Sequence, residues 1–209
     1  HDEFADAHEF TLYGKDACST VRELRSNGQI ETSAASLACY TVMNPDLVSK
    51  LAHKIFVVIG CDHPMSPTQS LLKIPGVTVL GIPSSKMGLD QVLRYAAYNN
   101  PDDTTFVYPT VSKEEGGNDG NLILSRGPHV AQWILEQTKE AFRESQDSAL
   151  DPEIVLVPMP LPIVPGESRE RAVRWEASSD LIVQRVLRAR ADSMKCSVWS
   201  YQSSTTCMV

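Results

Sequence analysis

The chain has 209 residues and a formal net charge of −7, which is the length of one ordinary domain, or of one domain with an appendage. Its composition of 42% hydrophobic and 22% charged residues allows a buried core and excludes wholesale disorder. The acidic balance disfavours general nucleic-acid binding, which needs a basic face, and apolar runs such as Ile55–Cys61 are too short for a membrane span of roughly 20 residues.

The cysteines and the first residue bear on the expected compartment. The five cysteines are odd in number, widely spaced and without a C-x-x-C pair, a pattern that fits neither a disulfide scaffold nor a zinc site. We therefore expect a reducing compartment and no metal centre. The sequence begins at His1 without an apolar signal segment, so either a targeting segment has been removed or the numbering starts at the first ordered residue. The first alternative favours a processed protein of an organelle, plastid or mitochondrion, over a cytoplasmic one.

The sequence pattern of residues 1–53 differs from that of the rest of the chain. The segments Asp16–Arg25 and Pro45–His53 have helical spacing of apolar residues, and Pro45 stands at a favoured first helical position. The sequence therefore predicts a helical N-terminal extension over 1–53, followed by a main domain over 54–209. Helices this short are unstable alone, so we expect them to pack on the main domain or on a neighbouring protein.

From Lys54 onward short apolar segments alternate with helical ones. The predicted strands are 54–61, 76–82, 104–110, 153–159 and 196–201, and the helices between them are 68–73, 89–99, 128–144 and 167–191. Buried strands separated by helices are typical of a parallel sheet that is covered on both faces. Right-handed crossovers then favour an α/β fold with a doubly wound, Rossmann-like parallel sheet in the strand order 3-2-1-4-5.

In such sheets ligands bind beyond the carboxyl ends of the strands. The loops expected there are 60–67, 83–88, 109–127 and 158–167. Gly60 follows the first strand directly, where a glycine permits a tight turn and close approach of a pyrophosphate, and His63 lies in the same loop, where it could contact phosphate or act as a base. The candidate cofactor-binding residues of these loops are Gly60, Asp62, His63, Met65, Ser66, Ser84 and Lys86.

The first loop resembles the short-chain dehydrogenase/reductase superfamily. That family has a glycine, three variable residues and then Gly-hydrophobic-Gly; Gly60 matches the first glycine and Met65 the hydrophobic position. Pro64 and Ser66 replace the other two glycines, and Pro64 and Pro67 supply no backbone N–H to a phosphate. The resemblance covers roughly residues 54–202 as an order of strands and helices. It implies a divergent NAD(P)-binding Rossmann domain.

The second loop bears on the choice of cofactor. NAD-selective relatives have an acidic residue after the second strand, whereas this chain has Ser84, Ser85 and Lys86. A bound dinucleotide is therefore expected to be NADP rather than NAD. The other interpretation is a solvated surface turn, so the cofactor is either none or NADP.

The catalytic pair of the family is missing. Its tyrosine and lysine lie four residues apart on a helix, but none of the tyrosines at 13, 40, 95, 98, 108 and 201 has a lysine four positions later. Proton transfer to a carbonyl substrate by the usual route therefore has no support. The sequence assigns no catalytic residue.

Two hypotheses follow from these observations. The first is a non-catalytic, reductase-derived Rossmann-like subunit that contacts protein subunits of a larger complex, with a vestigial nucleotide site at most. The proline-stiffened segment Pro158–Pro165 favours it, because a rigid loop loses little entropy on docking. The arginines of Glu167–Ala191 form either a mixed-charge solvated face or a contact for an acidic partner. The alternative is an atypical NADP-dependent oxidoreductase.

Overall fold

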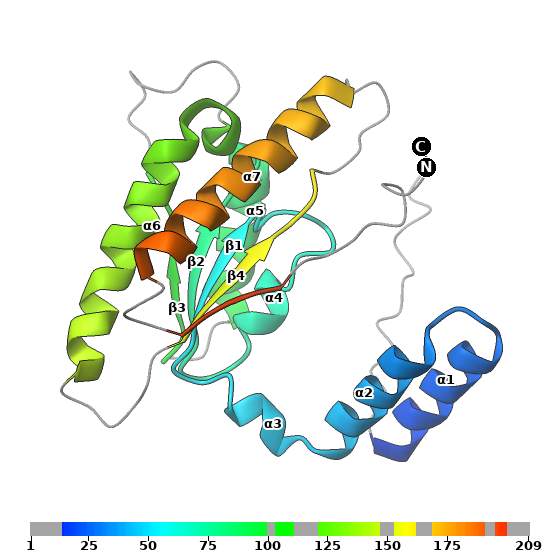
Figure 1. Cartoon of the computed structure of the whole chain (residues 1–209). Coiled ribbons are helices and arrows are strands. Elements are labelled where there is room, and N and C mark those ends of the chain that lie inside the picture. Colours follow the sequence, from blue (N-terminus) through cyan, green and yellow to red (C-terminus); the bar gives the residue numbers. More distant parts are fainter. Residues whose placement is uncertain are drawn as a thin grey trace. The chain divides into compact units, whose positions relative to one another are not determined.

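The computed structural model describes residues 14–99, 103–110, 121–146, 153–161, 169–190 and 195–199. The chain divides into two compact units, residues 1–50 and 51–209 (Figure 1). Several sequence predictions lie outside the described residues: the first ten residues, most of the loop 109–127, the prolines at 162 and 165, and the end of the predicted strand 196–201.

The first unit is a helical hairpin followed by one short helix. Gly28 lies just beyond the first helix at φ +69°, where glycine is favoured as a C-terminal cap. The thiols of Cys18 and Cys39 connect the two helices of the hairpin. Cys18 Sγ lies 3.6 Å from the Cys39 carbonyl oxygen, and Cys39 Sγ lies 3.8 Å from the Cys18 carbonyl oxygen. The helices are α1 (Gly14–Ser26), α2 (Thr32–Met43) and α3 (Asp46–Ser49).

The second unit contains a five-stranded sheet. All neighbouring strands are parallel, in the order β3-β2-β1-β4-β5, which confirms the predicted doubly wound, Rossmann-like topology. Ile55 of the central strand pairs with Thr78 on one side and Ile154 on the other. The strands are β1 (Ile55–Ile59), β2 (Thr78–Ile82), β3 (Thr105–Val107), β4 (Glu153–Pro158) and β5 (Lys195–Val198).

Helices cover both faces of this sheet. The long helices α6 and α7 lie side by side on one face (Figure 1), and Arg190 near the end of α7 donates a hydrogen bond of 2.6 Å to the Leu135 carbonyl of α6. The helices of this unit are α4 (Thr68–Leu71), α5 (Lys86–Asn99), α6 (Leu122–Gln146) and α7 (Arg169–Arg190).

The core consists of two layers, one on each side of the sheet. Alternate residues of a strand point to opposite faces, so Val57 and Ile59 pack toward α6 and α7, whereas Phe56 and Val58 pack toward α4 and α5. Trp175 of α7 is the largest fully buried side chain among the described residues. Since every residue of β1 is buried, the β-branched and aromatic run that predicted this strand is explained by burial on both faces.

Two predicted helices differ from the observed ones. The helix expected over 45–53 ends after one turn at Ser49. The helix expected to start at Pro128 begins six residues earlier, at Leu122, and has a break at Arg126 (φ −141°, ψ 32°). Pro128 has no backbone N–H with which to bond the preceding turn. The first turn of α6 is therefore separated from the rest of the helix by a kink.

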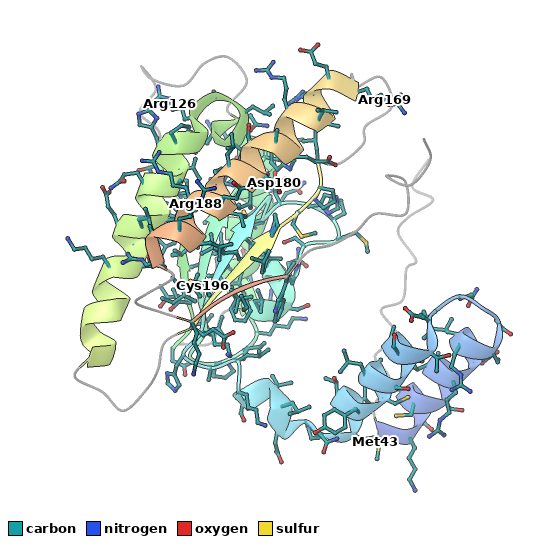
Figure 2. The ribbon with its side chains drawn as sticks, viewed as in Figure 1. Met43, Arg126, Arg169, Asp180, Arg188 and Cys196 are labelled. Carbon is teal, nitrogen blue, oxygen red and sulfur yellow. The ribbon has the colours of Figure 1, made fainter. Side chains whose placement is uncertain are left out.

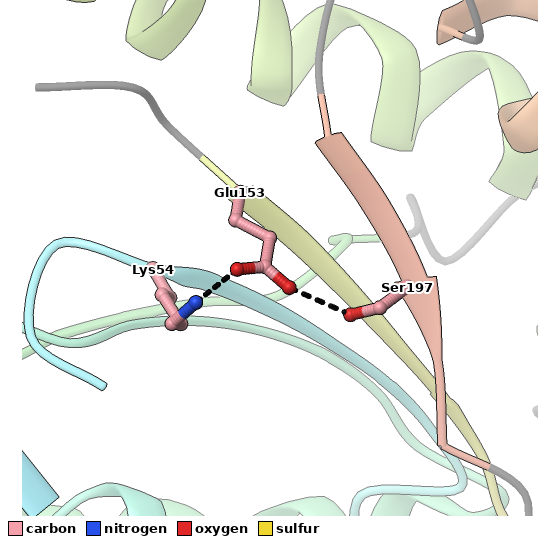
Figure 3. Close-up of polar contacts among 3 residues, drawn as sticks. All are labelled: Lys54, Glu153 and Ser197. Carbon is pink, nitrogen blue, oxygen red and sulfur yellow. Dashed lines mark hydrogen bonds and ion pairs between the residues drawn. The ribbon is translucent and has the colours of Figure 1, made fainter. Parts of the chain in front are cut away.

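A polar contact closes the amino-terminal end of the sheet (Figure 3). Lys54 forms an ion pair with Glu153, and Ser197 Oγ donates to Glu153 Oε1 at 3.0 Å. These hydrogen bonds, that of Lys54 above all, lower the pKa of the Glu153 carboxyl below its ordinary value of 4.5. The contact ties β1, β4 and β5 together at the end opposite to the candidate ligand loops.

This contact predicts a pH dependence of stability. Because the pKa of Glu153 is lower in the folded chain, its contribution is present above about pH 4.5 and is lost as the pH falls through the folded value. Glu153→Gln is expected to reduce the free energy of unfolding at pH 7 by a few tenths to about 1 kcal/mol, since the pair is partly solvated. Urea unfolding at pH 7 and pH 3.5 measures this. An equal gap between wild type and variant at both pH values would contradict the prediction.

Candidate functional site

The turn at Gly60 lies where a pyrophosphate would approach a dinucleotide-binding sheet. Gly60 has φ +85°, a conformation that favours glycine. A Cβ added there would lie 3.1 Å from the Met159 Cβ and 3.3 Å from the Trp175 ring. Both neighbours are buried, and Trp175 Nε1 donates to the Met159 carbonyl at 2.9 Å. The position that a side chain at residue 60 would take is therefore occupied by Met159 and Trp175, and the backbone conformation and this close packing are sufficient reasons for a glycine.

The backbone donors of the first loop are largely used within the fold. Gly60 and Cys61 both donate their N–H to the Ile82 carbonyl, at 2.7 and 3.1 Å. Two prolines, Pro64 and Pro67, have no N–H to offer. The other bonded N–H groups of the loop are His63 to the Gly60 carbonyl, Met65 to His63 Nδ1, Ser66 to the His63 carbonyl, and Thr68 to Ser66 Oγ.

Asp62 joins the first loop to the second. Its Oδ1 accepts the Ser84 N–H at 2.7 Å, and its Oδ2 accepts the Ser84 hydroxyl at 2.7 Å. Ser85 adds its N–H and its hydroxyl to Oδ2, both at 3.1 Å. The carboxylate thus receives four hydrogen bonds from two consecutive serines, which is the pattern of an anion held by a dedicated set of donors.

This carboxylate lies at the N-terminus of α5. Ser85 Oγ also accepts the Gly88 N–H at 3.0 Å, so Ser85 caps the helix in the usual way. A Cβ on Gly88 would lie only 2.1 Å from Asp62 Oδ2. A helix N-terminus attracts negative charge, and here the chain supplies that charge itself, beside the position where Ser84 and Lys86 were expected to meet a ribose phosphate.

The hydrogen bond of the His63 ring is local. Within the described residues, the ring is not seen to donate a hydrogen bond to Asp62. Its Nδ1 accepts the Met65 N–H at 3.0 Å, which leaves the proton of a neutral ring on Nε2. Burial lowers the pKa of His63, and the nearby Asp62 charge opposes this effect. At neutral pH this shift favours the neutral imidazole, which offers a phosphate no positive charge but is the form that could act as a base.

The remaining candidates divide between structural and exposed positions. Ser66 Oγ lies 2.7 Å from Thr68 Oγ1 at the start of α4. Met65 is 70% exposed, and the Lys86 side chain is also exposed. Cys61 is buried, and burial raises the pKa of its thiol, so it is no nucleophile at neutral pH. In the described ranges, no three His, Cys, Asp or Glu side chains gather as they would around a metal ion.

Sequence reasoning missed four residues of this region. Ser85 and Gly88 form the cap that holds Asp62, and Met159 and Trp175 pack directly against Gly60. The Ser-Ser pair before a helix is a capping signal that could have been used. No local pattern pointed to Met159 or Trp175, because Met159 reaches Gly60 from just after the end of β4 and Trp175 from α7.

Comparison with known proteins adds the following. No family model matches this sequence, and no curated protein matches it. Among solved structures the chain is similar to the ferredoxin-NADP+ reductase from Plasmodium falciparum, at 12% identity, covering 74% of this chain and 56% of that one, with a TM-score of 0.32. The chain thus spans little more than half the length of that reductase. Sheet order and layering define the present chain as an α/β protein of Rossmann-like fold. In the part that the structure describes, no helix is both long and apolar enough to cross a membrane.

Proposed function

We propose that this chain is a non-catalytic, reductase-derived Rossmann-like subunit that works through contacts with protein partners, and that its nucleotide site is vestigial. The observation that supports this most is that the backbone N–H groups that would bind a ligand already donate hydrogen bonds within the protein. The Ser84 and Ser85 N–H groups are bonded to Asp62, and Gly88 is bonded to Ser85. A dinucleotide would have to displace these bonds, and a polar group that loses its partner in a partly buried position costs free energy.

Electrostatics supports the same proposal. A phosphate that approached the N-terminus of α5 would meet the Asp62 carboxylate, which already occupies the position where the helix attracts negative charge. Like charges at short range repel in a poorly solvated position. Lys86 is one exposed cation beside this site, and a single solvated cation compensates such a repulsion only weakly.

The alternative, an atypical NADP-dependent oxidoreductase, needs space and a proton donor. The Gly60 turn packs closely against Met159 and Trp175. The sequence has no tyrosine followed four residues later by a lysine. Neither observation favours the enzyme, so the subunit remains our proposal.

Calorimetric titration with NADPH and with NADH tests the proposal. We expect dissociation constants no tighter than tens of micromolar, which is a binding free energy weaker than about −7 kcal/mol. Lys86→Ala should leave this weak binding unchanged, because no phosphate is expected near residue 86. Submicromolar binding of NADPH that Lys86→Ala weakens tenfold or more would overturn the proposal and favour the oxidoreductase.

A further inference from the structure

A groove lies between α6 and α7, on the helical face of the second unit. Its volume is about 640 Å³, which is within the usual range of ligand-binding clefts. Its floor is apolar: Ile123 and Ala131 come from α6, and Leu181 and Ile182 from α7. This groove does not include the loops around Gly60 and Asp62, and its arginines belong to the helix for which the sequence left open a contact with an acidic partner.

The kink in α6 opens this groove. Arg126 departs from helical geometry and Pro128 follows two residues later, so the first turn of α6 is offset from the rest. Gly127 between them has no side chain, and a Cβ there would lie 3.9 Å from Ile182 Cγ1. The side chain that an ordinary helix would place against Ile182 is thus missing, and Ile123 and Ile182 line an open space instead.

Arginines border the groove on the α7 side. Arg185 and Arg188 both line it, and both are exposed. They lie three residues apart and therefore on the same side of the helix; Arg188 is shown near the end of α7, with Arg126 at the kink of α6 (Figure 2). Neither Arg185 nor Arg188 has an ion pair within the described ranges, and no acidic residue is among those that line the groove.

Leu181 gives the groove an unpartnered apolar contact. It precedes Arg185 by one helical turn, and its side chain is 68% exposed. A leucine beside two arginines matches a ligand that is apolar on one side and negatively charged beside it. An amphipathic helix with acidic flanks has these properties, because its apolar residues recur on one face and its acids three or four positions apart reach the same side.

We propose that the groove between α6 and α7 binds an acidic amphipathic helix of a partner protein. Apolar side chains of that helix pack on Leu181, Ile182 and Ile123, and its carboxylates pair with Arg185 and Arg188. The proposal rests on the protein-binding role proposed above and gives that role a place and a partner chemistry. Helix-in-groove binding also suits a face where two helices already run side by side, since a third helix can pack between them.

A designed peptide tests the proposal on the full chain. The probe is a fluorescein-labelled peptide of about 18 residues, long enough to form a helix, with leucines along one face and glutamates beside them. Fluorescence anisotropy should give a dissociation constant on the order of 10 µM at low salt. The variant with Arg185→Glu and Arg188→Glu should bind at least about tenfold more weakly, because attraction becomes repulsion. A matching peptide with lysines in place of glutamates should bind this variant better than the wild type.

Two controls separate groove binding from general charge attraction. Arg94→Glu changes an exposed arginine of α5, on the other face of the sheet, and should leave peptide affinity within about twofold. A peptide of the same composition with its leucines scattered should bind at least about tenfold more weakly. The proposal is overturned if the designed peptide fails to bind, if Arg94→Glu weakens binding as much as the groove variant does, or if the scattered peptide binds equally well.

The peptide experiment and the dinucleotide titrations can fail independently of each other. The titrations with NADPH and NADH report on the loops around Gly60 and Asp62, whereas the peptide reports on α6 and α7. Loss of peptide binding with weak dinucleotide binding would remove the groove proposal alone. Tight NADPH binding would remove the non-catalytic proposal whatever the peptide does.

Discussion

Trp175→Ala is expected to lower the free energy of unfolding of the second unit by about 3–5 kcal/mol, the usual cost of removing a large buried aromatic side chain. Trp175 is fully buried between α7 and the sheet, and its indole N–H donates to the Met159 carbonyl. The substitution removes this hydrogen bond together with the ring that packs against Gly60. Urea unfolding followed by circular dichroism measures the change.

Two further variants give this prediction its controls. Trp175→Phe retains an aromatic ring but leaves the Met159 carbonyl without its donor, so we expect a smaller loss, of about 1–3 kcal/mol. Val173→Ala, on the same helix at a 60% exposed position, should stay within about 0.5 kcal/mol of the wild type. If Trp175→Ala cost no more than Val173→Ala, the position of α7 on the sheet would be wrong.

Gly88→Ala is expected to destabilise the chain by about 2–3 kcal/mol, although alanine is the better helix former by about 1 kcal/mol. The reason is steric, because the new Cβ would lie 2.1 Å from Asp62 Oδ2 and would push the carboxylate out of its hydrogen bonds with Ser84 and Ser85. Those partly buried donors then lose a charged partner.

A double-mutant cycle makes this prediction specific. In an Asp62→Gly background both the carboxylate and the Cβ of residue 62, which would lie 2.5 Å from the new Cβ, are absent, so Gly88→Ala should become neutral or stabilising by up to about 1 kcal/mol. The same change of residue would then have opposite signs in two backgrounds. Thermal and urea unfolding of the wild type, the single variants and the double variant give the coupling energy. Additive effects would show that Asp62 does not occupy the N-terminus of α5.

Much of the sheet could be predicted from the sequence, because the burial of β1, β2 and β4 on both faces leaves runs of apolar residues that need no tertiary knowledge to find. The strand order followed from the alternation with helices and from right-handed crossovers. The helix α2 was missed, since Thr32–Met43 has no charged residue and no clear apolar face. The helix α6 was predicted too short, because Pro128 is a normal helix start and the sequence does not show that one turn precedes it.

The sequence indicated the loops of the candidate site but not the contacts between them. Gly60 was predicted from its place after a strand, and the structure gives it the positive φ that a glycine turn requires. The bonds from Ser84 and Ser85 to Asp62 join residues more than twenty positions apart. Sequence patterns of capping and phosphate binding are local, so they listed the two loops separately and could not show that one loop satisfies the donors of the other.

The two outer strands of the sheet set a limit on how any partner can attach. β3 has three residues and β5 has four, so each offers only a few backbone groups at its outer edge. A partner that docks by β-strand addition needs a longer row of such groups to gain affinity from main-chain hydrogen bonds. If the proposed protein-binding role holds, recognition is therefore expected to rely on side chains, and its specificity could be changed residue by residue without rebuilding the sheet.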